Sequence, residues 1–74
     1  GAEVGIWEMT VGAMRDIEAD EFFVVLSGSA TVEFDDGTPA LHLGPGSVAR
    51  LSQGAHTRWT VTETLRKIYV IPQG

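Results

Sequence analysis

Residues 20–28, DEFFVVLSG, place two carboxylates directly before an apolar run that ends at a glycine. A run as hydrophobic as residues 22–27 is typical of a strand that is buried on both faces. An ionised carboxylate at the start of such a strand is costly unless a cation or hydrogen-bond donors meet it. Glu21 is therefore either a ligand or paired group inside the fold, or an oddly placed surface residue.

Short strand-like segments extend on both sides of this run. They combine β-branched, aromatic and alternating apolar residues, and they cover residues 4–10, 30–34, 40–43, 48–51, 57–61 and 65–71. Turn residues separate several of them, as DDG at 35–37, GPG at 44–46 and SQG at 52–54. No ten-residue segment shows the 3.6-residue period of a helix. The pattern predicts one all-β domain over residues 1–74, a sandwich or a barrel.

Size and charge exclude several classes of protein. A chain of 74 residues without cysteine has neither a large core nor a disulfide to stabilise it, and the lack of cysteine favours a reducing cytoplasm. The net charge of -5 argues against a nucleic-acid partner, because phosphate binding requires a basic face. No apolar run approaches the ~20 residues that span a bilayer, so we expect no membrane partner.

Four segments carry a resemblance to a known family. They are GIWEMTVG at 5–12, DEFFVVLSGSATV at 20–32, LGPGSV at 43–48 and RWTVTETLRKIYV at 58–70. Together they resemble the cupins, and in particular the small cupin domains grouped with ureidoglycine aminohydrolase and the ethanolamine-utilisation cupins. The resemblance implies a double-stranded β-helix, a jelly-roll barrel with a functional site in its mouth, often in a homodimer. Cupins usually have more chain at the N-terminus, so one or two opening strands would be missing and the chain would be a piece of a longer one.

The first cupin metal motif is only partly present. Glu21 and Gly28 keep its spacing between glutamate and glycine, with six residues between them. The two histidines of the motif would fall at Met14 and Asp16, or one residue further along, and neither position holds a histidine.

The second cupin metal motif is also incomplete. Gly46 and Gly54 match its glycines, but Thr57 occupies the histidine position and His56 comes one residue early. On a strand that single step turns the side chain to the opposite face, unless the loop at the strand entrance relaxes it. If a divalent metal such as manganese is bound, Glu21 and His56 are its expected ligands, but we expect a cupin that binds no metal and no other cofactor.

Strand alternation assigns the residues of the cup. Glu21 and Phe23 share the face that the cupin arrangement turns inward, and Trp59 is the expected inward aromatic of its strand. Residues 65–71 have two mixed faces, and hydrophobicity does not decide between them. If the face with Lys67 and Tyr69 is inward, Lys67 can neutralise Glu21 inside the cup.

The predicted ligand-binding residues are therefore Glu21, Phe23, Trp59, Lys67 and Tyr69. Each also has a plainer interpretation, since the aromatic residues can be ordinary core and the lysine a solvated charge. Outside this set, His42 is expected to point outward, and Trp7 can line the cup or cover the outside of the barrel.

Three functions follow from these residues. The first is a cupin domain that binds a small organic molecule in the barrel mouth without a metal, and it best accounts for an apolar cup that lacks the histidine set. The second is a metal-dependent enzyme resembling ureidoglycine aminohydrolase. The third is a structural or dimerisation module with no ligand. A small-molecule ligand and a second copy of the chain are the expected partners.

Overall fold

The protein folds as an antiparallel β-structure. The structure, a computed structural model, describes residues 1–73 and contains six strands over this range. These are β1 (Ala2–Met9), β2 (Gly12–Ile17), β3 (Glu21–Phe34), β4 (Leu41–Leu43), β5 (Val48–Leu51) and β6 (His56–Pro72). Residues 1–73 include no helix that is long and apolar enough to cross a membrane.

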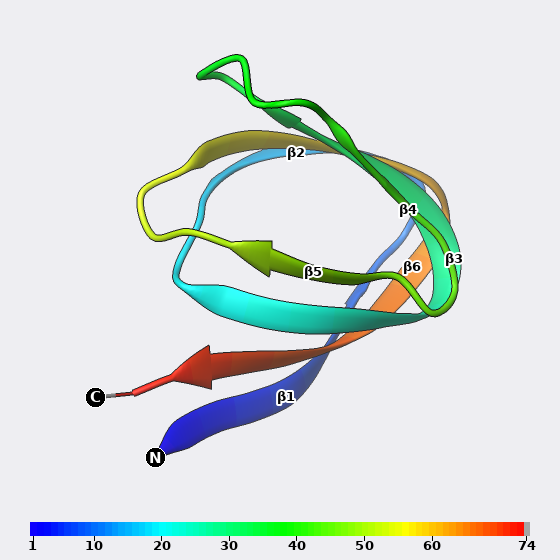
Figure 1. The fold of residues 1–74 in the computed structure, drawn as a ribbon. Helices are drawn as coiled ribbons and strands as arrows, with labels where there is room; N and C mark the ends of the chain where they lie inside the picture. Colours follow the sequence, from blue (N-terminus) through cyan, green and yellow to red (C-terminus); the bar gives the residue numbers. More distant parts are fainter. Residues whose placement is uncertain (74) are drawn as a thin grey trace.

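Two long strands connect two layers. The first half of β3 pairs with β5 and with the last part of β6, and this part of β6 also pairs with β1. The second half of β3 pairs with β4 and with the first part of β6, which also pairs with β2. The result is a β5-β3-β6-β1 layer and a β4-β3-β6-β2 layer, joined where β3 and β6 bend (Figure 1). This confirms the predicted all-β jelly-roll class.

The strand boundaries differ from the predicted ones in two ways. The predicted strands at 22–27 and 30–34 are both part of β3, and those at 57–61 and 65–71 are both part of β6. Both strands bend without a turn, and the sequence signal for a bend resembles that for a strand end. β2 was not predicted, because the apolar residues of its sequence GAMRDI do not alternate with the polar ones, and most of its residues are exposed.

Gly28 marks the bend of β3. Its φ of 88° lies in the left-handed region that favours glycine, and a Cβ atom there would overlap the carbonyl oxygen of Thr64. The apolar run of the sequence ends at this glycine, but the strand does not, since Gly28 lies inside β3. Val25 pairs with Lys67 and Ala30 pairs with Val61, so between these two pairs β3 advances five residues and β6 advances six. The inward face of β3 therefore changes from odd-numbered to even-numbered residues at the bend.

The core fills the space between the two layers. Its fully buried side chains come from β3, β5 and β6, namely Val25, Val32, Leu51, Thr57, Trp59, Val61 and Leu65. On β6 all the buried residues from Thr57 to Lys67 are odd-numbered, so its inward face is continuous through the bend. This settles the open question about residues 65–71, because the face that carries Leu65 and Lys67 points inward.

Candidate functional site

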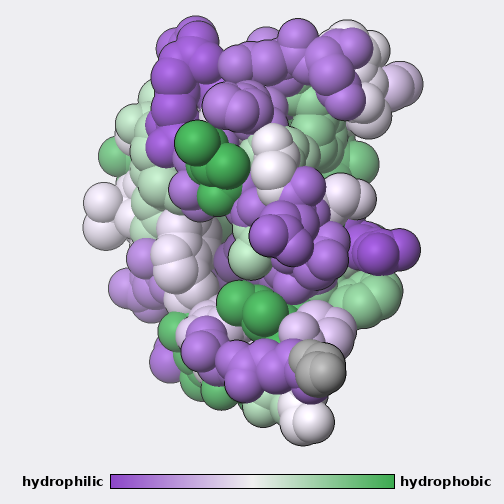
Figure 2. All heavy atoms as spheres, turned by 90° about the vertical axis from the view of Figure 1, so that its left-hand side faces the viewer, coloured by the Kyte–Doolittle hydropathy of each residue, from purple (hydrophilic) through white to green (hydrophobic). Residues whose placement is uncertain are grey.

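A cavity of about 200 Å³ is lined by residues of both layers. Its ionisable side chains, apart from the tyrosine, are Glu3, Asp16, Glu18, Glu21 and Lys67. Four carboxylates thus face one ammonium group, and the formal charge of the lining is -3. The side of the molecule opposite the bends is covered mainly by hydrophilic residues, with separate small hydrophobic patches (Figure 2).

Aromatic and apolar side chains form the rest of the cavity wall, namely Trp7, Trp59, Tyr69, Met14 and Ile71. Trp7 and Trp59 lie with ring centroids 5.6 Å apart and planes tilted by 58°, within the usual geometry of aromatic pairs. The location of Trp7, which the sequence left open, is therefore the cup. Phe23 is 2% exposed and packs behind Trp59 in the core, so this predicted site residue does not line the cavity.

Lys67 and Glu21 form a buried ion pair. Lys67 Nζ donates a hydrogen bond to Glu21 Oε1 at 2.6 Å, and the two residues are only 5% and 8% exposed. The ammonium also lies 4.3 Å from the ring centroid of Phe23, 4.7 Å from that of Trp59 and 4.9 Å from that of Trp7. A desolvated cation at such distances is attracted by the ring faces. The pairing that the sequence allowed if this face of residues 65–71 is inward is thus present, and Lys67 is not a solvated charge.

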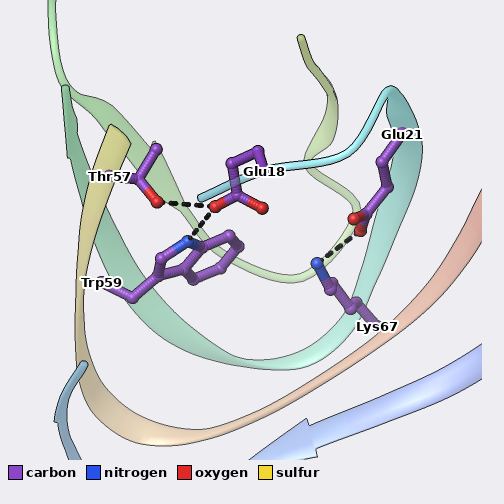
Figure 3. Close-up of polar contacts among 5 residues, drawn as sticks. All are labelled: Glu18, Glu21, Thr57, Trp59 and Lys67. Carbon is purple, nitrogen blue, oxygen red and sulfur yellow. Dashed lines mark hydrogen bonds and ion pairs between the residues drawn. The ribbon is translucent and has the colours of Figure 1, made fainter. Parts of the chain in front are cut away.

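Glu18 is a second buried carboxylate, and it is 7% exposed. Its Oε2 atom accepts hydrogen bonds from Thr57 Oγ1 at 2.6 Å and from Trp59 Nε1 at 2.9 Å (Figure 3). Its backbone is held on the loop after β2, because the Glu18 amide donates to Ala55 O at 2.9 Å and the Gly54 amide donates to Glu18 O at 2.8 Å. The loop after β2 thus supplies the acceptor that the buried indole N–H of Trp59 requires.

The second oxygen of Glu18 faces the cavity. Within residues 1–73 no hydrogen bond reaches Oε1. Every fully buried side-chain nitrogen or oxygen in this range has a hydrogen-bond partner, so Oε1, which has none, is not fully buried. Oε1 is therefore accessible from the cup and not sealed in the core. In Figure 3 it points toward the side of the cup that holds Glu21 and Lys67.

Tyr69 lies on the same strand as Lys67 and borders the cavity. Burial raises the pKa of its hydroxyl above the ordinary 10.0, and the negative charge of nearby Glu3 raises this pKa further. Tyr69 pairs in register with Gly5 of β1, and its ring end lies where a Cβ of residue 5 would be. Gly5 thus leaves room for the tyrosine at this edge of the cup.

The comparison with known proteins agrees with this architecture. Residues 1–69 match the model of the EutQ-like cupin domain. The chain belongs to this cupin family. No curated protein matches it.

Solved structures resemble this cupin closely. A DUF861 family protein from Thermotoga maritima has 29% identity and a TM-score of 0.80, with 88% of this chain and 74% of that chain covered. The EutQ protein of Clostridium difficile has 21% identity and a TM-score of 0.80, and a putative ethanolamine utilization protein Q from Salmonella typhimurium has 18% identity and a TM-score of 0.79. Each comparison covers 93% of this cupin but only 54% and 55% of the EutQ chains. This chain spans about half their length, and the likeness to them shows the fold.

The residues of the cup do not fit a cupin metal site. At the positions of the first histidine pair, Met14 and Asp16 line the cavity, and at the third histidine position Thr57 is buried. His56 is exposed and borders a different hollow with Arg15, so the structure does not bring it to Glu21. Within residues 1–73 no three His, Asp or Glu side chains gather in a group able to hold a metal. His42 is exposed, as expected.

Glu18 is the buried site residue that the sequence did not reveal, and Glu3 and Ile71 of the cavity lining were not predicted either. Alternation places Met14, Asp16 and Glu18 on one side of β2 and of the residues that follow it. In the β2–β6 register Met14 pairs with Trp59 and Asp16 pairs with Thr57. Because β2 was not predicted, this parity was not available. One signal was present: the buried indole N–H of Trp59 requires an acceptor, and a carboxylate on the neighbouring strand can supply it.

Proposed function

We propose that this cupin domain binds a small organic molecule in its cup without a metal. The observation that carries the proposal is the position of Lys67. Its ammonium, held at 2.6 Å by Glu21 and surrounded by three aromatic rings, supplies from the chain itself the positive charge that the buried carboxylate needs. A divalent ion bound to Glu21 would have to displace this ammonium or lie close to it.

The size and composition of the cavity support a small ligand. Its volume of about 200 Å³ exceeds the ~150 Å³ of an engineered apolar cavity that accepts benzene. Aromatic walls with a few convergent polar groups are the usual composition of small-molecule sites. Trp7, Trp59 and Tyr69 supply the walls, while Glu18 presents an accessible oxygen.

Two measurements test the proposal. Elemental analysis of protein purified without chelator should return far less than one metal ion per chain, and a value near one manganese, zinc or iron would refute metal independence. A set of small organic compounds of every charge type should include some that shift the NMR signals of Trp7 and Trp59. If no compound moves either indole signal, the cup is not a binding site and the domain is a structural module.

We also propose that the domain forms a homodimer through the outer face of the β5-β3-β6-β1 layer. Large apolar side chains are exposed on this face, including Val4, Ile6, Phe22, Leu26 and Val48. Exposed charges of both signs, Glu8 and Arg66, sit opposite each other in the β1–β6 register. A face that is apolar and carries both signs can pair with a copy of itself around a two-fold axis.

Light scattering after size exclusion tests the dimer with a matched pair of variants. Val48 on this face is 75% exposed, and Val11 in the link between β1 and β2 is 65% exposed. We expect Val48→Lys to be monomeric and Val11→Lys to keep the dimer. A monomeric wild-type chain at high concentration, or two dimeric variants, would contradict the proposal.

A metal-dependent enzyme resembling ureidoglycine aminohydrolase is the alternative function. Ammonia release from ureidoglycine above the rate in buffer would favour the enzyme alternative over simple binding. We place the domain in the cytoplasm because a chain without cysteine suits a reducing compartment. The net charge of -5 supports the view that nucleic acid is not a partner.

A further inference from the structure

We infer that the molecule bound in the cup is a small organic cation with N–H donors, such as a primary ammonium, and that Glu18 is its main recognition residue. The inference rests on the proposed binding function and adds the chemical class of the ligand. It follows from three features of the cup: its unbalanced charge, the free oxygen of Glu18, and the aromatic surface that Lys67 already occupies.

The charge of the cup is unbalanced after its internal ion pair is counted. Lys67 neutralises Glu21, so Glu3, Asp16 and Glu18 remain among the ionisable residues that line the cavity. The ion pairs formed within residues 1–73 are Lys67 with Glu21 and Arg15 with Asp35, and neither involves these three carboxylates. Three negative charges around one small space attract a cation and repel an anion.

Glu18 differs from the other two acidic residues because it is buried. It is 7% exposed, and the hydrogen bonds from Thr57 and Trp59 both reach the same oxygen, Oε2. These donors fix the carboxylate in one orientation but bring no positive charge. The free Oε1 atom faces the cavity, so an ammonium bound there would form a short, charge-assisted hydrogen bond. It would also supply the cation that this carboxylate lacks.

The aromatic rings favour an ammonium with N–H donors over a quaternary one. Methylated ammonium ions are recognised chiefly by aromatic faces. Here the faces of Trp7, Phe23 and Trp59 already surround Lys67 Nζ, within 4.3–4.9 Å of their ring centroids. A ligand cation must therefore bind mainly through hydrogen bonds to carboxylates, which a quaternary nitrogen cannot donate.

A matched series of ligands tests the charge directly. The ¹⁵N-labelled chain is titrated at constant ionic strength with n-butylammonium, 1-butanol, butyrate and tetramethylammonium, and the indole N–H signal of Trp59 is followed. This proton donates to Glu18 and so reports on the carboxylate. We expect saturable shifts with n-butylammonium, and binding at least about tenfold weaker for each of the other three.

Two variants that each remove one negative charge test the role of Glu18 in binding. Glu18→Gln should weaken n-butylammonium binding by about tenfold or more, because the amide keeps an oxygen for Thr57 and Trp59 but loses the negative charge. Glu33→Gln removes one charge at an exposed position of β3 outside the cavity and should leave the affinity unchanged. If Glu18→Gln does not fold, Asp16→Asn at the exposed edge of the cup replaces it, with an expected loss of about twofold to threefold.

The outcomes separate the two proposals. Binding of 1-butanol or butyrate as tight as that of n-butylammonium would overturn the cation inference and leave small-molecule binding intact. Equal loss of affinity in Glu18→Gln and Glu33→Gln would overturn the role of Glu18. If none of these compounds and none of the wider set moves the indole signals, binding in the cup itself is refuted.

Discussion

Two buried glutamates three residues apart are stabilised in different ways within one cup. Glu21, at the start of β3, is held by the ammonium of Lys67 at 2.6 Å. Glu18, on the loop before it, is held by the hydroxyl of Thr57 and the indole of Trp59. One carboxylate therefore meets a full positive charge and the other meets only neutral donors.

The difference shows what each carboxylate is suited to do. The Glu21 pair is balanced in charge, and its cation is enclosed by aromatic rings, so it contributes a fixed internal element of the cup. The Glu18 carboxylate is fixed in orientation but not neutralised, and one of its oxygens is open to the cavity. A site that is oriented and incomplete is the kind that a ligand completes.

The largest expected effect comes from removing the cation of the balanced pair. Lys67→Met leaves Glu21 as a buried charge without a partner, and we expect it to lower the free energy of unfolding by about 3–5 kcal/mol. Urea denaturation followed by tryptophan fluorescence measures this change. For a domain of this size the loss is large enough to unfold much of the protein.

A compensating variant makes this prediction falsifiable even if Lys67→Met does not fold. Replacing both partners, as in Glu21→Met with Lys67→Met, removes both charges together and should recover most of the lost stability. A double variant no more stable than Lys67→Met would show that the ion pair is not the reason for the loss.

The next effect is the difference in stability between two variants in which one or the other glutamate is replaced by glutamine. Glu21→Gln deprives Lys67 of its charge partner, whereas Glu18→Gln keeps an acceptor for both of its donors. We expect Glu21→Gln to cost more stability than Glu18→Gln by about 1–3 kcal/mol in urea denaturation. Equal costs, or the reverse order, would remove the distinction drawn between the two sites.

An effect of similar size isolates the hydrogen-bond role of Glu18. Glu18→Leu removes the acceptor and leaves the hydroxyl of Thr57 and the indole of Trp59 without their short bonds. We expect a loss of about 1–3 kcal/mol relative to Glu18→Gln, because buried donors without acceptors are costly. A leucine variant as stable as the glutamine variant would mean that water or another acceptor replaces the carboxylate.

The smallest effect uses Tyr69 as a reporter of charge. Its pKa lies above 10.0 because of burial and the charge of Glu3, so Glu3→Gln should lower this pKa toward 10.0. Because the folded-state pKa is raised, the stability it contributes is fully present below about pH 10 and is lost as the pH rises through the folded-state pKa. Tyr69 is the only tyrosine, so absorbance titration of phenolate formation measures its pKa.

The matched control for that titration is Glu18→Gln. Glu3 and Glu21 contribute to the raised pKa of Tyr69, and Glu18 is not among its causes. The pKa of Tyr69 should therefore be the same in Glu18→Gln as in the wild type. A shift of equal size in Glu3→Gln and Glu18→Gln would show that Tyr69 does not distinguish the two sides of the cup.

Much of the cup follows from strand parity. Alternation from Glu21 placed Phe23 on the inward face, and Trp59 was the expected inward aromatic of its strand, as the structure has them. Parity also offered Lys67 as the partner of Glu21. It did not decide which face of residues 65–71 is inward, because each face mixes polar and apolar side chains and burial depends on the layer packed against it.

Other features depended on pairing that has no local signal. β2 is an edge strand whose apolar residues do not alternate with its polar ones, so hydrophobic periodicity does not reveal it, and Glu18 was missed with it. The change of inward face along β3 depends on how many residues each of two paired strands uses at the bend. That count is a property of the pair and cannot be read from either strand alone.

By itself the sequence determined the β-class, the alternation of each long strand and the charge that Glu21 brings into an apolar interior. These are local properties, set by side-chain type and by the two-residue period of a strand. Only the tertiary structure decided which cation meets Glu21, that Glu18 is buried beside Trp59, and that Phe23 lies behind the cavity wall. Each of these depends on the register between segments about 36 to 46 residues apart in the chain, which the fold as a whole sets.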